Sequence, residues 1–215
     1  MKILAVSDTR DSGLYDFFSK DKVDGVKLIL SCGDLSKNYL EFLVTMVNKP
    51  LAYVRGNHDE GFRKDPPEGC DCLEDTVLVI NGIRIAGLGG SMRYKDSEEM
   101  YTEKQMEKRV RRLKKKIEKA GGLDILVTHA PLKGFGDADD LTHQGFACVR
   151  QILDLYHPLY LIHGHMHREY GNFERQREYG ETRIINACGR VIIDFPYERI
   201  VPEEKKRKNI FSKWF

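Results

Sequence analysis

The sequence predicts an α/β protein built on a mixed β sheet, and two patterns indicate this class. In the first third of the chain, three strand-like runs alternate with two helix-like segments, and this order is typical of parallel strands. Further along, Asn81-Gly82 joins two β-branched runs, and this dipeptide favours a two-residue turn between antiparallel strands. Parallel and antiparallel pairs together require a mixed sheet.

Nine apolar or β-branched runs have the length of strands. They cover residues 2–7, 26–32, 51–55, 76–80, 83–87, 124–128, 159–163, 183–187 and 190–195. We expect the last third of the chain, beyond the final helix, to form β hairpins.

Four segments are expected to be helical: residues 13–20, residues 37–47, a helix that follows Thr102, and residues 142–155. The third is the best defined, since Thr102 and Gln105 form a capping-box pattern. Four apolar residues then recur at helical spacing up to the stop at Gly121-Gly122. They are Met106, Val110, Leu113 and Ile117.

Length and composition predict one compact, soluble domain. The chain has 215 residues, of which 41% are hydrophobic and 32% charged, and its formal net charge is +2. We expect a single domain over residues 1–200 and a basic, aromatic tail over 201–215, which could dock on the domain, stay disordered, or touch a membrane or partner. No apolar run approaches the ~18 residues of a membrane span, so we expect a cytoplasmic protein.

The cysteines do not indicate a disulfide framework. There are five, an odd number with no repeated spacing, so reduced thiols are expected. Only Cys70 and Cys72 are close together, and a C-x-C pair lacks the four ligands of a structural zinc site. A surface loop is the simpler interpretation of this pair.

Polar side chains that can bind metals follow five of the expected strands. Because the carboxyl ends of strands form the binding crevice of an α/β sheet, we expect these residues to converge. Carboxylates, an amide oxygen and imidazoles suit first-row divalent cations, and the set is large enough for two ions sharing one carboxylate. The candidate ligands are Asp8, Asp34, Asn57, His129, His165 and His167.

Each of these features alone has a structural explanation. Gly33-Asp34 could be an ordinary turn, and His129 could be a hydrogen-bonded histidine at a strand end. Three imidazoles within His163-Gly164-His165-Met166-His167 are difficult to explain by packing. The combination, in this order and at strand ends, favours a metal site.

The motifs together resemble the calcineurin-like metallophosphoesterase superfamily, over about three quarters of the chain. They are Asp8-Thr9-Arg10, Gly33-Asp34, Gly56-Asn57-His58-Asp59, His129 and Gly164-His165-Met166-His167. The resemblance implies a four-layer α/β/β/α sandwich of two mixed β sheets flanked by helices. It also implies one or two divalent ions per chain, of manganese, iron or zinc.

The resemblance also assigns the metal ligands to two sites. Asp34 would bridge the ions, and Asn57, His129 and His165 would complete the second site. The first site would hold Asp8 and His167.

The implied reaction is hydrolysis of a small-molecule or nucleotide phosphoester by a metal-bound water. His58 would face the phosphate and stabilise or protonate the leaving oxygen, since an ordinary imidazole titrates near ~6.5. Asp59 would support the turn that carries Asn57 and His58. Phosphodiesters are favoured over monoesters because no large cap or specificity insertion is visible.

Arg10 departs from the family pattern, which has histidine at this position. A guanidinium has no free lone pair and stays protonated, so Arg10 is not a metal ligand and the first site should be weakened. Arg10 could bind substrate phosphate and so act in catalysis. It could equally form a salt bridge with Asp11, Asp59 or another nearby acid.

Other interpretations stay open. Loss of the first-site histidine is also compatible with a scaffold or interaction module whose metal site has degraded. The basic helix over residues 103–119, with nine basic and three acidic residues, could hold nucleic acid in a nuclease or be a solvated face. Asp139, Asp140 and His143 could border the pocket or belong to an exposed capping loop.

Overall fold

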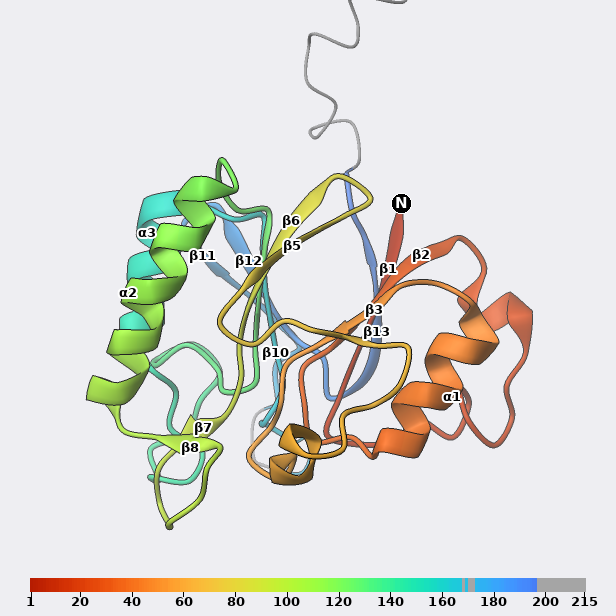
Figure 1. The fold of residues 1–215 in the computed structure, drawn as a ribbon, viewed down its shortest axis with the longest axis horizontal. Helices are drawn as coiled ribbons and strands as arrows, with labels where there is room; N and C mark the ends of the chain where they lie inside the picture. Colours follow the sequence, from red (N-terminus) through yellow and green to blue (C-terminus); the bar gives the residue numbers. More distant parts are fainter. Residues whose placement is uncertain (168, 170–172, 197–215) are drawn as a thin grey trace, which may run out of the picture.

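Two β sheets pack face to face in the computed structural model, with helices on both outer faces (Figure 1). The structure describes residues 1–167, 169 and 173–196. The first sheet has the strand order β13-β1-β2-β3-β4. Its strands are β1 (Lys2–Ser7), β2 (Val26–Ser31), β3 (Leu51–Tyr53), β4 (Asp71–Cys72) and β13 (Gly189–Asp194).

The second sheet has the strand order β11-β12-β10-β9-β6-β5. Its strands are β5 (Val77–Ile80), β6 (Ile83–Leu88), β9 (Ile125–Thr128), β10 (Tyr160–His163), β11 (Gln176–Tyr179) and β12 (Thr182–Asn186). A separate short pair consists of β7 (Ser91–Met92) and β8 (Met100–Tyr101).

The helices form the two outer layers. α1 (Lys37–Val47) covers the first sheet, and α2 (Glu103–Lys119) and α3 (Arg150–Tyr156) cover the second (Figure 1). Three short 3₁₀ helices lie in the connections: η1 (Lys20–Val23), η2 (Glu60–Arg63) and η3 (Ala147–Val149).

Alternation along the strands explains why four layers form. In β1, Ile3 and Ala5 face the second sheet, whereas Leu4 and Val6 face α1. Successive side chains of a strand point to opposite faces, so a strand that is apolar on both must be covered on both. A third apolar cluster joins the outer face of the second sheet to α2 and α3.

The main sequence predictions are confirmed. β1, β2 and β3 are parallel, and β5 and β6 form an antiparallel hairpin around Asn81-Gly82. Both turn residues have positive φ, as this hairpin turn requires. The capping box of α2 is formed by Thr102 and Gln105. The four-layer sandwich of two mixed sheets is therefore the observed fold.

Two predicted helices are wrong in extent. Residues 13–20 contain turns, and only the four-residue η1 follows, because the amides after Ser12 bond to Asp11 and Ser12 in short turns. The helix expected over 142–155 begins only at Arg150. Gly145 lies directly against the backbone of Pro131 and Leu132, and the next residue, Phe146, donates its amide to the Pro131 carbonyl, so no continuous helix passes through this point.

The expected hairpins in the last third are only partly correct. β11 and β12 are antiparallel neighbours, but β12 and β13 belong to different sheets. The chain crosses between the sheets at Ala187 and Cys188, and β13 then pairs with β1 at the edge of the first sheet. The sequence pattern of β12 and β13 did not indicate which strands they pair with, because pairing between segments far apart in the sequence depends on tertiary packing.

Within the described residues, no helix is long and apolar enough to cross a bilayer. All five cysteines are free thiols, and Cys72 lies exposed on β4. The predicted tail over 201–215 lies outside the described residues, and the division of the chain at residue 200 stays a prediction.

Candidate metal centre

The carboxyl ends of five strands meet at one edge of the sandwich, three from the first sheet and two from the second. The turns that follow β1, β2 and β10 each hold a predicted ligand in the left-handed backbone region. Asp8, Asp34 and His165 have φ values of 62°, 55° and 68°. Such conformations cost energy for residues other than glycine and gather at functional sites.

Asp34, His129 and His165 form the core of the candidate centre. One potential ligand atom from each lies within 4.8 Å of those of the other two. His129 is fully buried, and its Nε2 lies 3.4 Å from Asp34 Oδ2 and 3.0 Å from Asn57 Oδ1. Four of the predicted ligands are therefore brought together, from both sheets.

Backbone carbonyls orient the two imidazoles. Nδ1 of His129 lies 2.7 Å from the carbonyl oxygen of Cys32, and Nε2 of His165 lies 2.7 Å from that of Thr142. A carbonyl only accepts, so these nitrogens carry hydrogen. In His129 the other nitrogen, Nε2, then faces the candidate ligands Asp34 and Asn57, which is the arrangement of metal-bound histidines. The donor set thus fits a divalent metal.

The charges of the core depend on one another. Burial is the largest single influence and opposes ionisation of both Asp34 and His129, but their mutual attraction and the neighbouring hydrogen bonds and charges together outweigh burial. These combined interactions raise the pKa of His129 to about 9 and hold the pKa of Asp34 below its ordinary value. At His165, burial, helped by the charge of His129, lowers the pKa to about 3. His165 is therefore neutral, as a ligand must be, whereas His129 must release a proton to bind metal.

Asp8 and His167 lie beside this core. Both carboxylate oxygens of Asp8 accept from the amide of His165, at 2.9 and 3.1 Å, which joins the turns after β1 and β10. Burial raises the pKa of Asp8 above its ordinary value. The His167 side chain is 38% exposed, and its Nε2 lies 4.0 Å from Asp8 Oδ1. The histidine of this half is therefore more exposed than His129, whose side chain is fully buried.

Arg10 is directed to an acid that the sequence did not single out. Its guanidinium lies 3.4 Å from Asp16 and stacks over the Tyr15 ring at 4.6 Å, whereas Asp11 pairs with Arg190. The Arg10 side chain is 53% exposed. It also lines a cavity of about 250 Å³ that His167 borders, so it stays within reach of the site.

Asp59 ties the turns after β2 and β3 to each other. Its Oδ2 accepts from the amides of Asp34 and Gly56, at 2.7 and 2.8 Å. In return, Asp34 Oδ1 accepts from the amide of His58 at 2.9 Å. Burial raises the pKa of Asp59 to about 6, with the Asp34 charge as a smaller cause. The His58 side chain is exposed beside this double connection.

Two glycines permit these close approaches. A Cβ atom at Gly56 would collide with the carboxylate of Asp34, and one at Gly164 would collide with Ser7 and Asp8. Any side chain at either position would push two ligand turns apart.

The loop over 137–143 both borders the site and caps itself. Asp140 accepts from the amides of Thr142 and His143, as a capping residue does. Yet the His143 ring lies 5.7 Å from that of His165, and Asp139 lines a cavity of about 320 Å³ next to His167. Both interpretations of this loop therefore hold in part.

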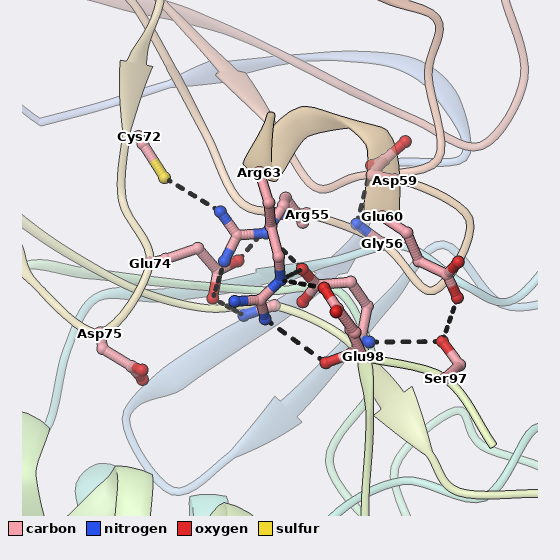
Figure 2. A network of polar contacts seen from close by, with 12 residues as sticks. Arg55, Gly56, Asp59, Glu60, Arg63, Cys72, Glu74, Asp75, Ser97 and Glu98 are labelled. Atoms are coloured by element: carbon pink, nitrogen blue, oxygen red, sulfur yellow. Dashed lines mark hydrogen bonds and ion pairs between the residues drawn. The ribbon is translucent and has the colours of Figure 1, made fainter. Parts of the chain in front are cut away.

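A network of buried ions supports the β3 turn, and no sequence motif indicates it (Figure 2). Glu74 accepts from the amide of Arg55 at 2.8 Å and pairs with Arg109, and Glu99 receives Arg55 Nε at 2.6 Å. Glu74 and Glu99 each stand next to another acid, Asp75 and Glu98, in loops without a recognisable pattern. Only their burial next to Arg55 distinguishes them from surface carboxylates.

The fold and the donor set define a class: a four-layer α/β sandwich with a candidate metal centre at the carboxyl ends of its strands. A model of the calcineurin-like phosphoesterase family matches residues 1–169, and the chain belongs to that family. The family typically binds divalent metals. None of the curated proteins is a significant match to this chain.

Two solved structures with TM-scores above 0.5 confirm the fold. One crystal structure shares 16% identity with a TM-score of 0.62, covering 90% of this chain and 94% of its own. TT1561 of Thermus thermophilus shares 18% identity with a TM-score of 0.61, covering 87% of this chain and 89% of its own. An archaeal phosphodiesterase shares 17% identity, covering 93% and 96%, with a TM-score of 0.44.

Proposed function

We propose that this protein is a metal-dependent phosphoesterase that acts on small-molecule or nucleotide phosphoesters, with phosphodiesters favoured over monoesters. Asp34, Asn57, His129 and His165 would hold one cation, of manganese, iron or zinc. Asp8 and His167, with Asp34 as the shared carboxylate, would hold a second cation more weakly. The diester preference rests on the lack of a large cap in the sequence.

The bound cations would supply Lewis acidity and activate water at neutral pH. Side chains of the protein would protonate the leaving oxygen and keep the turn around Asn57 and His58 in place. His58, exposed beside the Asp34 turn, would donate a proton to the leaving oxygen, and Asp59 would hold that turn through two amides. Arg10 would either add a cation near the substrate phosphate or stay paired with Asp16.

One observation carries the metal assignment. In His129 and His165, one ring nitrogen is held by a backbone carbonyl, and a potential ligand atom of each ring lies within 4.8 Å of one on Asp34. A histidine held only for packing needs no such orientation toward a shared carboxylate. One of these rings follows β9 and the other follows β10 of the second sheet, and both lie beside an acid that follows β2 of the first sheet, which supports a metal centre.

The test measures bound metal and the hydrolysis of a generic aryl phosphodiester and monoester with added Mn²⁺. Wild type is compared with Asp34→Ala and His58→Ala. We expect Asp34→Ala to lose metal and nearly all activity, and His58→Ala to keep metal while its rate falls about 100-fold. If wild type is no faster than Asp34→Ala, the protein is a scaffold and the enzyme proposal is wrong.

A second candidate function, hydrolysis or binding of nucleic acid, is favoured by the outer face of α2. Six exposed basic residues lie within an arc of about 100° over about 22 Å of helix. They are Lys104, Lys108, Arg111, Arg112, Lys115 and Lys119. Two of the helix's acids are directed to the neighbouring flank, where Glu103 accepts from the amide of Cys148 and Glu118 from Tyr156. Outside this helix, acidic residues outnumber basic ones by 30 to 26.

Salt dependence tests this candidate. Arg111→Glu/Lys115→Glu should weaken binding to duplex DNA or RNA and lower its salt slope. Lys20→Glu/Lys27→Glu, with the same charge change elsewhere, should have little effect. If neither nucleic acid binds, the face is only solvated.

A further inference from the structure

One carboxylate oxygen holds both ends of the segment that carries Asn57, His58 and Asp59. Oε1 of Glu99 receives Nε of Arg55 at 2.6 Å and Nε of Arg63 at 2.7 Å. Arg55 immediately precedes the segment, and Arg63 ends η2, which follows it. Figure 2 shows the two guanidinium groups converging from these ends.

Burial distinguishes this contact from a surface salt bridge. The Glu99 side chain is fully buried, whereas those of Arg55 and Arg63 are 12% and 40% exposed. Its second oxygen accepts from the Tyr101 hydroxyl at 3.0 Å. A buried carboxylate without its partners is strongly unfavourable, so the geometry of these three donors is fixed far more firmly than that of an exposed pair.

The two ends of the segment depend on Glu99 to different degrees. At the first end, the backbone of Arg55 is also held, since Glu74 accepts from its amide and the amide of Gly90 donates to its carbonyl, both at 2.8 Å. At the second end, η2 has no buried residue. It is connected to the body by Arg63, by a hydrogen bond that the Ser97 hydroxyl donates to Glu60, and by the Phe62 ring, 5.9 Å from that of Tyr53.

We propose that Glu99 is a positioning residue of the candidate centre: it closes the segment 56–62 into a fixed loop by joining Arg55 and Arg63. The closed loop keeps the Asn57 amide oxygen next to His129 and keeps His58 at the edge of the site. Its effect on catalysis rests on the proposed function, but its effect on the loop does not.

The test compares Glu99→Gln with Glu98→Gln. Glu98 is the adjacent acid and also approaches Arg63, at 3.3 Å, but its side chain is 73% exposed. Hydrogen exchange of the amides over 56–62 is measured first. We expect exchange at least tenfold faster in Glu99→Gln and unchanged in Glu98→Gln.

Metal binding and kinetics then test the consequence for the site. Glu99→Gln should bind Mn²⁺ about 10–100-fold more weakly. Removing a residue that positions a metal ligand without binding the metal typically weakens metal affinity by this amount. The kcat for the aryl phosphodiester should fall by a similar factor, with KM changed less than about threefold. Arg63→Gln should reproduce these effects in part. The double variant Arg63→Gln/Glu99→Gln should be no worse than Glu99→Gln, because both break the same contact.

The outcomes separate this proposal from the proposed function. If wild type hydrolyses neither ester, the enzyme proposal fails. The rate of hydrogen exchange at the amides of residues 56–62 still decides whether Glu99 positions this loop. If Glu99→Gln only lowers the melting temperature, with exchange, Mn²⁺ affinity and kcat matching Glu98→Gln, Glu99 is structural and the inference is overturned. Should Glu99→Gln not fold, Arg63→Gln carries the same comparison.

Discussion

The two halves of the candidate centre differ in how their histidines are held. His129 is fully buried, and both of its ring nitrogens have defined partners from the first sheet. The His167 side chain is 38% exposed, and its Nε2 lies 4.0 Å from Asp8 Oδ1. The buried half contains all four residues that the family resemblance assigned to the second site, and the exposed half is the one in which arginine stands where the resemblance expects histidine. How precisely a candidate ligand is positioned therefore depends on its burial and on the contacts that its side chain makes with the surrounding protein.

The largest expected effect separates the two histidines. His129→Ala should weaken Mn²⁺ binding about 100-fold, because it removes a ligand and leaves Asp34 without its buried partner. His167→Ala should weaken it about tenfold or less. Titration calorimetry of both variants decides the comparison, and equal losses would show that the halves are equivalent.

The next largest effect concerns the close contact of the turns in the buried half. Gly56→Ala should lower the free energy of unfolding by about 1–3 kcal/mol, because the new Cβ collides with the Asp34 carboxylate. Gly61→Ala is the matched control, since a Cβ there meets no atom within 4 Å. Urea unfolding measures both, and a similar cost at Gly61 would contradict the collision.

Asp59→Asn should cost about 1.5 kcal/mol of stability, since two amides lose a charged acceptor. It should also lower the rate of ester hydrolysis, because the Asp34 and Gly56 turns are no longer tied. Asp65→Asn serves as control, as that side chain is 74% exposed and pairs with Lys37. An unchanged rate in Asp59→Asn would limit this residue to stability.

The smallest expected effect would make the exposed half resemble the buried one. Arg10→His should strengthen Mn²⁺ binding at the weaker site about tenfold, because an imidazole supplies the lone pair that a guanidinium lacks. Bound metal per chain and the rate of ester hydrolysis should rise together. If metal content rises while the rate falls, Arg10 acts on the substrate, and the difference between the halves is functional.

Much of the fold, and the convergence of the core candidate residues, could be predicted from the sequence. Strand periodicity, the Asn81-Gly82 turn and the Thr102 capping box are local signals, and all three were confirmed. Asp34, Asn57, His129 and His165 were identified because each follows a strand, and the carboxyl ends of strands meet at one edge. The structure places these four together.

Other features could not be predicted because they have no local signal. The helix over 142–155 is shortened by packing of Gly145 against Pro131, which lies in a separate segment before the loop. β12 and β13 separate into different sheets because β13 finds its partner at β1, at the opposite end of the chain. Arg10 meets Asp16 through a turn that the helical prediction over 13–20 did not contain.

The sequence by itself determined the chemistry of the candidate centre: which residue types are present, in what order, and at which strand ends. Only the tertiary structure decided how firmly each is held, since the carbonyls of Cys32 and Thr142 and the carboxylates of Glu74 and Glu99 come from distant segments. Periodicity and turn propensity act between neighbours along the chain. The energy that fixes a ligand comes from burial and hydrogen bonds between segments that meet only after folding.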